Sequence, residues 1–227
     1  MRRIVLFDID GTLVAGGPAK DAFIEAMVDT YGTAGDAAGV SFAGKTDPQI
    51  ARQLLSGVGM DDEDIENGFD DLWVRYLAYL EARLPGDPVR VLPGVGALLD
   101  ALAEHDDVGV GLLTGNIVGG ARLKLDSGGL WDHFGFGSYG SDHEERDQLP
   151  AIAVDRARQL FGSAVTAEGT IVVGDTPRDV ACGKAGGTRT LAVATGHFGF
   201  FDLEAAGADH VIEDLSSTDD VVTLLVE

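Results

Sequence analysis

The sequence predicts an α/β fold, in which a Rossmann-like parallel sheet forms the core and a helical cap domain is inserted into it. Short apolar runs lie at residues 4–7, 108–113, 170–173, 190–193 and, more weakly, 210–212. Helical patterns separate most of these runs, and strands that alternate with helices are typical of a parallel sheet covered on both faces. Residues 16–90 break the alternation, because they show helical patterns and no convincing strand.

The first run, residues 4–7, is wholly apolar and stops at Asp8, which is the pattern of a buried parallel strand that ends at a functional turn. The insert that follows predicts helices at residues 19–31, 47–55 and 61–83. The last of these begins with four acidic residues, which suit a helix N-terminus. It also carries an apolar and aromatic stripe, which is more typical of a core than of a ligand site.

Three further helices are predicted beyond the insert, at residues 95–104, 149–161 and 177–185. The last opens with Pro177, and proline is favoured at the first helical position. We therefore expect a Rossmann-like catalytic core made of residues 1–15 and 91–227, and a helical cap made of residues 16–90. A chain of 227 residues is long enough for this division.

The amino-acid composition limits the kinds of partner that the protein is expected to bind. Lys and Arg total 16 against 38 Asp and Glu, a formal net charge of −22. Such a surface repels nucleic acid and anionic membranes, so we expect neither as a partner. An anionic substrate would need local positive charge at its site.

The single cysteine, Cys182, excludes an intrachain disulfide. No apolar run approaches the length of a signal peptide core or a membrane span. We therefore expect a cytoplasmic protein.

Polar residues follow three of the predicted strands. They read Asp8-Ile-Asp10-Gly11-Thr12, Thr114-Gly115-Asn116 and Gly174-Asp175-Thr176-Pro177-Arg178-Asp179. The carboxyl ends of parallel strands meet at one edge of a sheet, where ligands bind. Carboxylates gathered there would repel one another without a cation, and oxygen ligands favour Mg²⁺ over zinc. The predicted metal ligands are Asp8, Asp10, Asp175 and Asp179.

Roles follow from this arrangement if a phosphate ester is the substrate. Asp8 is placed to attack phosphorus and form an acyl-phosphate. Asp10 could protonate the leaving oxygen and later deprotonate water, a role that needs its pKa raised by burial or by neighbouring carboxylates. Gly11 lets the backbone approach the phosphate closely, and Thr114 with the N–H groups after it can bind the phosphate oxygens. The other predicted phosphate-binding residues are Thr12, Gly115 and Asn116, the last of which could equally serve as a helix cap.

These motifs resemble those of the haloacid dehalogenase-like superfamily, over almost the whole chain. DIDGTLV resembles its first motif, LLTGN its second and VVGDTPRDV its acidic fourth. The resemblance implies that Thr114 binds phosphate, that Asp175 holds magnesium and that Asp179 is a ligand or supports one through water. The run ARLKLDSGGLWDHFGFGSYGSD, the long C-terminal segment and a helical cap at this point of the chain resemble the phosphoglycolate-phosphatase-like branch.

The third motif departs from the family pattern. The family places a Lys near a Lys-Pro pair before the fourth motif, whereas this chain reads Glu-Arg-Asp-Gln-Leu-Pro at residues 145–150. Arg146 is our candidate for the missing cation, because an Arg can bind phosphate through two hydrogen bonds. Lys124 and Lys184 remain alternatives.

Two motifs suggest other functions. Residues 39–46 satisfy GxxxxGK[ST], the pattern of a nucleotide-binding P-loop, but residues 33–38 before it have no strand character. In the cap interpretation, Lys45 instead touches substrate. Residues 135–140 fit GxGxxG, but no apolar helix follows, so a dinucleotide site is rejected.

We therefore expect a magnesium-dependent phosphatase that acts on a small phosphorylated metabolite. One alternative is phosphoryl transfer of the β-phosphoglucomutase type, but Thr12 resembles the DGT motif of the phosphatases better than the corresponding mutase pattern. A P-loop nucleotide-binding protein is the alternative from another functional class.

Overall fold

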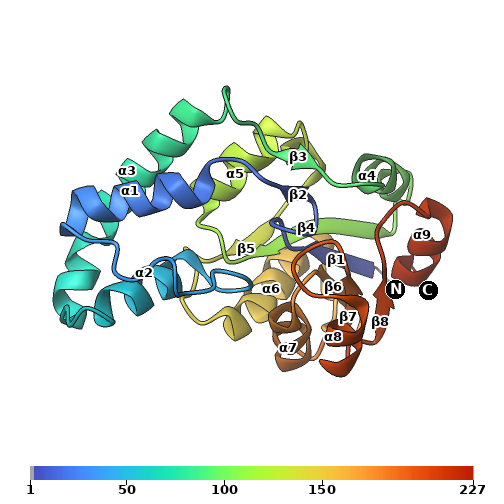
Figure 1. Cartoon of the computed structure of the whole chain (residues 1–227). Coiled ribbons are helices and arrows are strands. Elements are labelled where there is room, and N and C mark those ends of the chain that lie inside the picture. Colours follow the sequence, from blue (N-terminus) through green and yellow to red (C-terminus); the bar gives the residue numbers. More distant parts are fainter. Residues whose placement is uncertain (1–2, 227) are drawn as a thin grey trace.

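The computed structural model describes residues 3–226, and its centre is one six-stranded parallel sheet (Figure 1). The strand order is β5-β4-β1-β6-β7-β8. The strands of this sheet are β1 (Arg3–Phe7), β4 (Val108–Thr114), β5 (Gly137–Tyr139), β6 (Thr170–Gly174), β7 (Arg189–Val193) and β8 (His210–Ile212). The predicted α/β fold with a parallel sheet is confirmed.

Helices cover both faces of the sheet. They are α4 (Val95–Ala103), α5 (Val118–Ser127), α6 (Leu149–Phe161), α7 (Pro177–Ala185), α8 (Phe200–Ala205) and α9 (Thr218–Val226), with short 3-10 turns η1 (Trp131–His133) and η2 (Arg146–Gln148). Helices α6 and α7 pack against the sheet on one side, whereas α4 and α9 lie together on the other (Figure 1).

The residues of β1 alternate between these two faces. Ile4 and Leu6 belong to the hydrophobic core that includes residues of α6, whereas Val5 and Phe7 belong to the larger core shared with α4, α9 and the insert. All four are fully buried. The run is therefore apolar without alternation because both of its faces are covered, as expected of a central parallel strand.

The insert contains α1 (Ala19–Tyr31), α2 (Asp47–Ser56) and α3 (Asp62–Arg83), and we refer to these helices and the loops between them as the cap. It leaves and rejoins the core through β2 (Val14–Ala15) and β3 (Arg90–Val91), which pair antiparallel with each other. Helices α1 and α3 pack along one another. The aromatic stripe of α3 is core as predicted, because Leu72, Tyr76 and Leu80 are buried.

The sequence pattern missed several elements, of which α5 lies nearest the site. Two adjacent glycines in its first turn lower its helical propensity. A Cβ atom on Gly119 would lie 2.6 Å from Leu77 Cδ1 of α3, so the glycine lets the cap helix approach α5 closely. Strands β2, β3 and β5 and helices α8 and α9 were also missed, all of them short.

A helix that spans a membrane must be both long and apolar, and no helix within residues 3–226 meets both requirements.

Candidate active site

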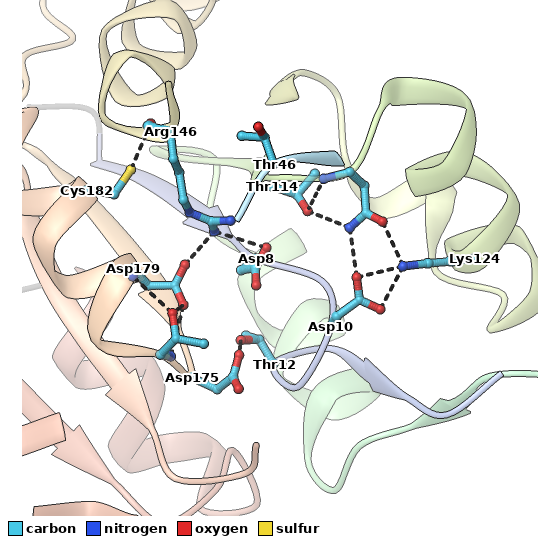
Figure 2. A network of polar contacts seen from close by, with 12 residues as sticks. Asp8, Asp10, Thr12, Thr46, Thr114, Lys124, Arg146, Asp175, Asp179 and Cys182 are labelled. Atoms are coloured by element: carbon cyan, nitrogen blue, oxygen red, sulfur yellow. Dashed lines mark hydrogen bonds and ion pairs between the residues drawn. The ribbon is translucent and has the colours of Figure 1, made fainter. Parts of the chain in front are cut away.

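Three neighbouring strands deliver the polar motifs to one edge of the sheet. β1 lies between β4 and β6, so the residues that follow Phe7, Leu113 and Gly174 are neighbours in space. The backbone N–H of Asp8 donates to the carbonyl oxygen of Val173 at 2.9 Å, which ties the end of β1 to β6. Figure 2 shows the side chains of Asp8, Thr114 and Asp175 gathered in this region.

Three buried carboxylates form a cluster at this edge. One oxygen from each of Asp8, Asp175 and Asp179 lies within 4.8 Å of the others. The hydroxyl of Thr12 donates to Asp175 Oδ1 at 3.3 Å. The backbone N–H and hydroxyl of Thr176 donate to Asp179 Oδ2 at 2.9 and 2.7 Å, which fixes Asp179 in the first turn of α7.

The cluster carries more negative charge than its surroundings compensate. Burial raises the pKa of Asp8 to about 7, with the charge of Arg146 opposing the rise and that of Asp179 adding to it. Burial, followed by repulsion from Asp179 and Asp8, raises the pKa of Asp175 to about 8. Buried carboxylates that resist ionisation in this way fit a divalent cation, which would supply the missing positive charge.

Arg146 is the cation that lies beside the nucleophile candidate. It comes from η2, is buried, and its Nη2 lies 3.3 Å from Asp8 Oδ1 and 2.5 Å from Asp179 Oδ1 (Figure 2). The thiol of Cys182 donates to the Arg146 carbonyl oxygen at 3.2 Å and so braces η2 from α7. Arg146 Nε has no hydrogen-bond partner within residues 3–226. Of the two alternatives, Lys184 is exposed and donates to the Ala206 carbonyl oxygen, away from the site.

The other alternative, Lys124, lies in a second polar group around Asp10. The Lys124 ammonium is 2.9 and 2.7 Å from the two carboxylate oxygens of Asp10 and donates to Asn116 Oδ1 at 2.7 Å. The amide of Asn116 donates in turn to Asp10 Oδ2 and to the Thr114 hydroxyl, both at 2.8 Å. Figure 2 shows this group on the opposite side of Asp8 from Arg146.

This pairing changes the expectation for Asp10. Its carboxylate lies outside the cluster of Asp8, Asp175 and Asp179. Desolvation alone would raise the pKa of Asp10, but the charge of Lys124 and hydrogen bonds from Lys124 and Asn116 outweigh it, so the pKa is lowered. The raised pKa that an acid role requires is therefore not found in this arrangement.

Lys124 was missed as a partner of Asp10, although the sequence contains a signal. It lies between Ala121 and Leu125 on the buried face of α5. A lysine on the apolar face of a helix needs an anion within reach, because an unpaired buried charge is costly. That argument points to a carboxylate of the site, but it does not say which one.

Two glycines of the motifs allow close approach. Gly11 has φ +87°, and a Cβ atom there would collide with the Asp175 carboxylate. A Cβ atom on Gly115 would collide with the backbone carbonyl of Lys45 in the cap. Gly11 thus keeps the loop after β1 against the carboxylate cluster, and Gly115 lets the cap sit directly on the end of β4.

The cap loop that contains Lys45 is hydrogen-bonded to the core. The backbone N–H of Asp47 donates to the Gly115 carbonyl oxygen at 2.8 Å, and the Ile117 N–H donates to Asp47 Oδ2 at 2.8 Å. Thr46 donates its hydroxyl to the Glu144 carbonyl oxygen at 2.7 Å and caps α2. Residues 32–46 contain neither helix nor strand, so no strand feeds the P-loop-like pattern.

Cap and core together enclose a cavity of about 550 Å³. The predicted residues Asp8, Asp10, Gly11, Lys45, Thr114, Gly115, Asn116, Arg146 and Asp175 all line it. Thr12 and Asp179 lie behind this lining, where each bonds a neighbour in the site. The ammonium of Lys45 donates to Gln53 Oε1 at 2.5 Å.

Proteins of related sequence can be aligned with nearly the whole length of this chain. It is 31% identical over 225 residues to a phosphoglycolate phosphatase of Rhodospirillum rubrum, a match that spans 97% of this chain and 90% of the relative. It is 28% identical over 220 residues to a phosphoglycolate phosphatase of Pseudomonas putida, spanning 94% of this chain and 77% of that one.

Solved structures share the fold. A hydrolase from Pseudomonas syringae superposes with a TM-score of 0.74 at 19% identity, over the full length of both chains. A β-phosphoglucomutase from Clostridium difficile gives a TM-score of 0.69 at 15% identity, covering 100% of this chain and 97% of the other. At these identities the likeness concerns the fold alone.

The family assignment rests on sequence. A family model described as haloacid dehalogenase-like hydrolase matches residues 2–187, which is most of the chain and includes all the motifs discussed above. The chain belongs to the haloacid dehalogenase-like hydrolases, as its motifs predicted.

Proposed function

We propose that this protein is a magnesium-dependent phosphatase that hydrolyses a small phosphate monoester through an aspartyl-phosphate on Asp8. The observation that carries the proposal is the buried cluster of Asp8, Asp175 and Asp179, whose oxygens lie within 4.8 Å of one another beside Arg146. Relatives named phosphoglycolate phosphatase support the reaction class, and phosphoglycolate belongs in any substrate panel.

The reaction has two displacements at phosphorus. An oxygen of Asp8 attacks the phosphorus, the bond to the ester oxygen breaks, and that oxygen leaves as an alcohol after taking up a proton. Water then attacks the phosphorus of the acyl-phosphate, which releases inorganic phosphate and restores the Asp8 carboxylate. Arg146, Thr114 and the backbone N–H groups near Gly115 would hold the phosphate oxygens while their charge grows.

Asp10 is our candidate for moving the protons. Its ionised carboxylate is the form that takes a proton from the attacking water in the second displacement. We retain its acid role in the first displacement as part of the proposal, and we expect substrate to alter the pairing with Lys124 before that step.

The metal site fits the residues that are present. Asp8 and Asp175 would hold the cation, with Asp179 as a direct ligand or through water. Asp10 is the fourth ligand of the proposal, and it would have to release Lys124, with which its carboxylate is paired in this structure. An all-oxygen donor set favours Mg²⁺, which when bound would neutralise charge on the carboxylates and the phosphate.

The proposal also includes a division of the chain into a catalytic core and a cap. We take residues 1–15 and 91–227 as the catalytic core and residues 16–90 as the cap, since β2 and β3 pair where the two parts join. Phosphoryl transfer of the β-phosphoglucomutase type is the second candidate, because it would use the same Asp8 and the fold is shared.

The decisive experiment measures hydrolysis of p-nitrophenyl phosphate with Mg²⁺, for the natural chain and for Asp8→Asn. We expect turnover by the natural chain and none by the variant. Acid-quenched protein should also carry phosphate that hydroxylamine releases, as an acyl-phosphate would. Undiminished turnover by Asp8→Asn would remove Asp8 from its role. Conversion of a sugar 1-phosphate into the 6-phosphate without release of inorganic phosphate would favour the mutase.

A further inference from the structure

The active-site cavity has two chemically different sides. The core side is polar and includes Asp8, Asp10, Thr114, Arg146 and Asp175. The side made by the cap is mainly apolar. A phosphate ester bound with its phosphorus near Asp8 would therefore place its alcohol part against the cap.

Five cap side chains form the apolar wall: Phe23, Val40, Phe42, Ile50 and Tyr76. They come from α1, α2, α3 and the loop between α1 and α2. The rings of Phe23 and Phe42 meet edge to face with centroids 6.0 Å apart, and those of Phe23 and Tyr76 do so at 5.4 Å. Phe23, Ile50 and Tyr76 are almost wholly buried, so the wall is held in place by the core of the cap.

The other polar side chains of the cap that line the cavity are exposed or already engaged in a contact. The Lys20 ammonium lies 5.0 Å from the centroid of the Phe42 ring, and Lys20 is exposed, as is Ser41. Lys45 donates to Gln53 and also lines a separate surface hollow. The Asp47 carboxylate accepts the Ile117 N–H.

Tyr76 is the exception within the wall. It is 2% exposed, and it lines the cavity. Its hydroxyl is the one polar group among the five side chains of the wall, and it lies buried beside the cavity.

We propose that the cavity accepts the phosphate monoester of an alcohol with a mainly apolar body, aliphatic or aromatic, that carries at most one hydrogen-bonding group opposite Tyr76. The inference rests on the proposed phosphatase function and names its substrate class. Hydroxyl groups of a sugar would lose water against the wall without finding partners there, whereas an apolar body gains by leaving water.

A matched pair of substrates tests this. Cyclohexylmethyl phosphate and glucose 6-phosphate share a six-membered ring and a primary phosphate ester, and they differ mainly in the polarity of the ring. With Mg²⁺ present, we expect kcat/KM to be higher for cyclohexylmethyl phosphate by about tenfold or more.

Variants of the wall should reduce that ratio. Phe42→Ser removes a partly buried ring from the loop, and Val40→Thr replaces one methyl group by a hydroxyl with little change in shape. We expect the ratio to fall by about three- to tenfold in each. Phe201→Ser makes the same chemical change as Phe42→Ser at a side chain that is 81% exposed on α8, and it should leave the ratio unchanged.

The outcomes separate the two claims. If the natural chain hydrolyses neither these esters nor p-nitrophenyl phosphate, the phosphatase itself is disproved. If it hydrolyses p-nitrophenyl phosphate but handles glucose 6-phosphate as well as cyclohexylmethyl phosphate, only the substrate class is overturned. A preference that Phe42→Ser and Val40→Thr leave intact would likewise overturn the role of the wall.

Discussion

The Lys124 ammonium contacts both carboxylate oxygens of Asp10, at 2.9 and 2.7 Å, from the buried face of α5. Its third hydrogen bond goes to Asn116, which itself holds Thr114. One lysine therefore connects the proposed proton carrier with the proposed phosphate ligand.

Replacing Lys124 by Met should lower kcat by more than about tenfold, because the Asp10 carboxylate loses the charge that orients it. KM for p-nitrophenyl phosphate should change much less, since Arg146, the proposed cationic phosphate ligand, pairs with Asp8 and Asp179 and not with this group. Steady-state kinetics measures both constants. Lys184→Met, which removes an exposed charge on α7, is the control. A full kcat in Lys124→Met would show that Asp10 needs no such support.

Arg146→Ala should reduce kcat/KM by about a hundredfold or more, because no other cation of the described chain lies beside Asp8. Arg146→Lys should recover part of the loss, since a single ammonium restores the charge but not the two-sided contact with Asp8 and Asp179. Circular dichroism would check that both variants fold. Activity of Arg146→Ala equal to that of the natural chain would mean that a different cation serves the phosphate.

Mg²⁺ should raise the melting temperature more at pH 8 than at pH 6. Burial raises the pKa of Asp8 and Asp175 to about 7 and 8, so the metal-free folded protein holds protons there that the unfolded chain has released. Its stability therefore falls as pH rises from about 4 to 8. The cation competes with these protons, so its binding strengthens over the upper part of that range.

Thermal melts at the two pH values, with Mg²⁺ and with EDTA, measure the effect. Asp175→Asn should reduce both the gain from Mg²⁺ and its dependence on pH. An equal gain at pH 6 and pH 8 would contradict the assignment of these carboxylates to the metal.

Gly115→Ala should lower kcat/KM strongly while leaving the core folded, because the added methyl group collides with the Lys45 carbonyl and pushes the cap loop off the end of β4. Gly96→Ala is the matched control, since its Cβ meets nothing within 4 Å on α4. That change should be neutral or stabilise by about 0.5–1 kcal/mol. Wild-type kinetics in Gly115→Ala would show that the loop contact is dispensable.

The sequence predicted those features of the fold that depend on long apolar runs and on local turn chemistry. β1, β4, β6 and β7 were expected near their observed positions, because buried parallel strands are mainly apolar, and the partly buried β8 was expected more weakly. Strand β5 has three residues, two of them Gly137 and Ser138, which is too short a run for an apolar pattern, and it pairs with β4 at the edge of the sheet. Helix α5 was missed because its glycines disfavour a helix, and the packing of Leu77 against Gly119 that accounts for one of them is visible only in the structure.

The sequence predicted which residues form the site, and the structure shows that they form two groups, one around Asp8 and Arg146 and the other around Asp10 and Lys124. The motifs indicated that Asp8 and Asp175 would lie together, since both follow neighbouring strands. They did not indicate that Asp10 would turn to Lys124, because that pairing depends on how α5 is placed beside the loop after β1. Nor could spacing reveal the apolar wall, which is assembled from three helices and a loop of the cap.

The pairing of β2 with β3 has a consequence for how such enzymes diversify. Because Ala15 lies opposite Arg90, the polypeptide leaves the core and returns to it at one point, through two adjacent strands. An exchange of the whole segment between those residues would join the new segment to the core at this one place, and the new segment would also have to fit the core at Gly115 and Gly119. Recombination there would replace the cap, which we propose contacts the alcohol, while Asp8, Thr114 and Arg146 keep their places.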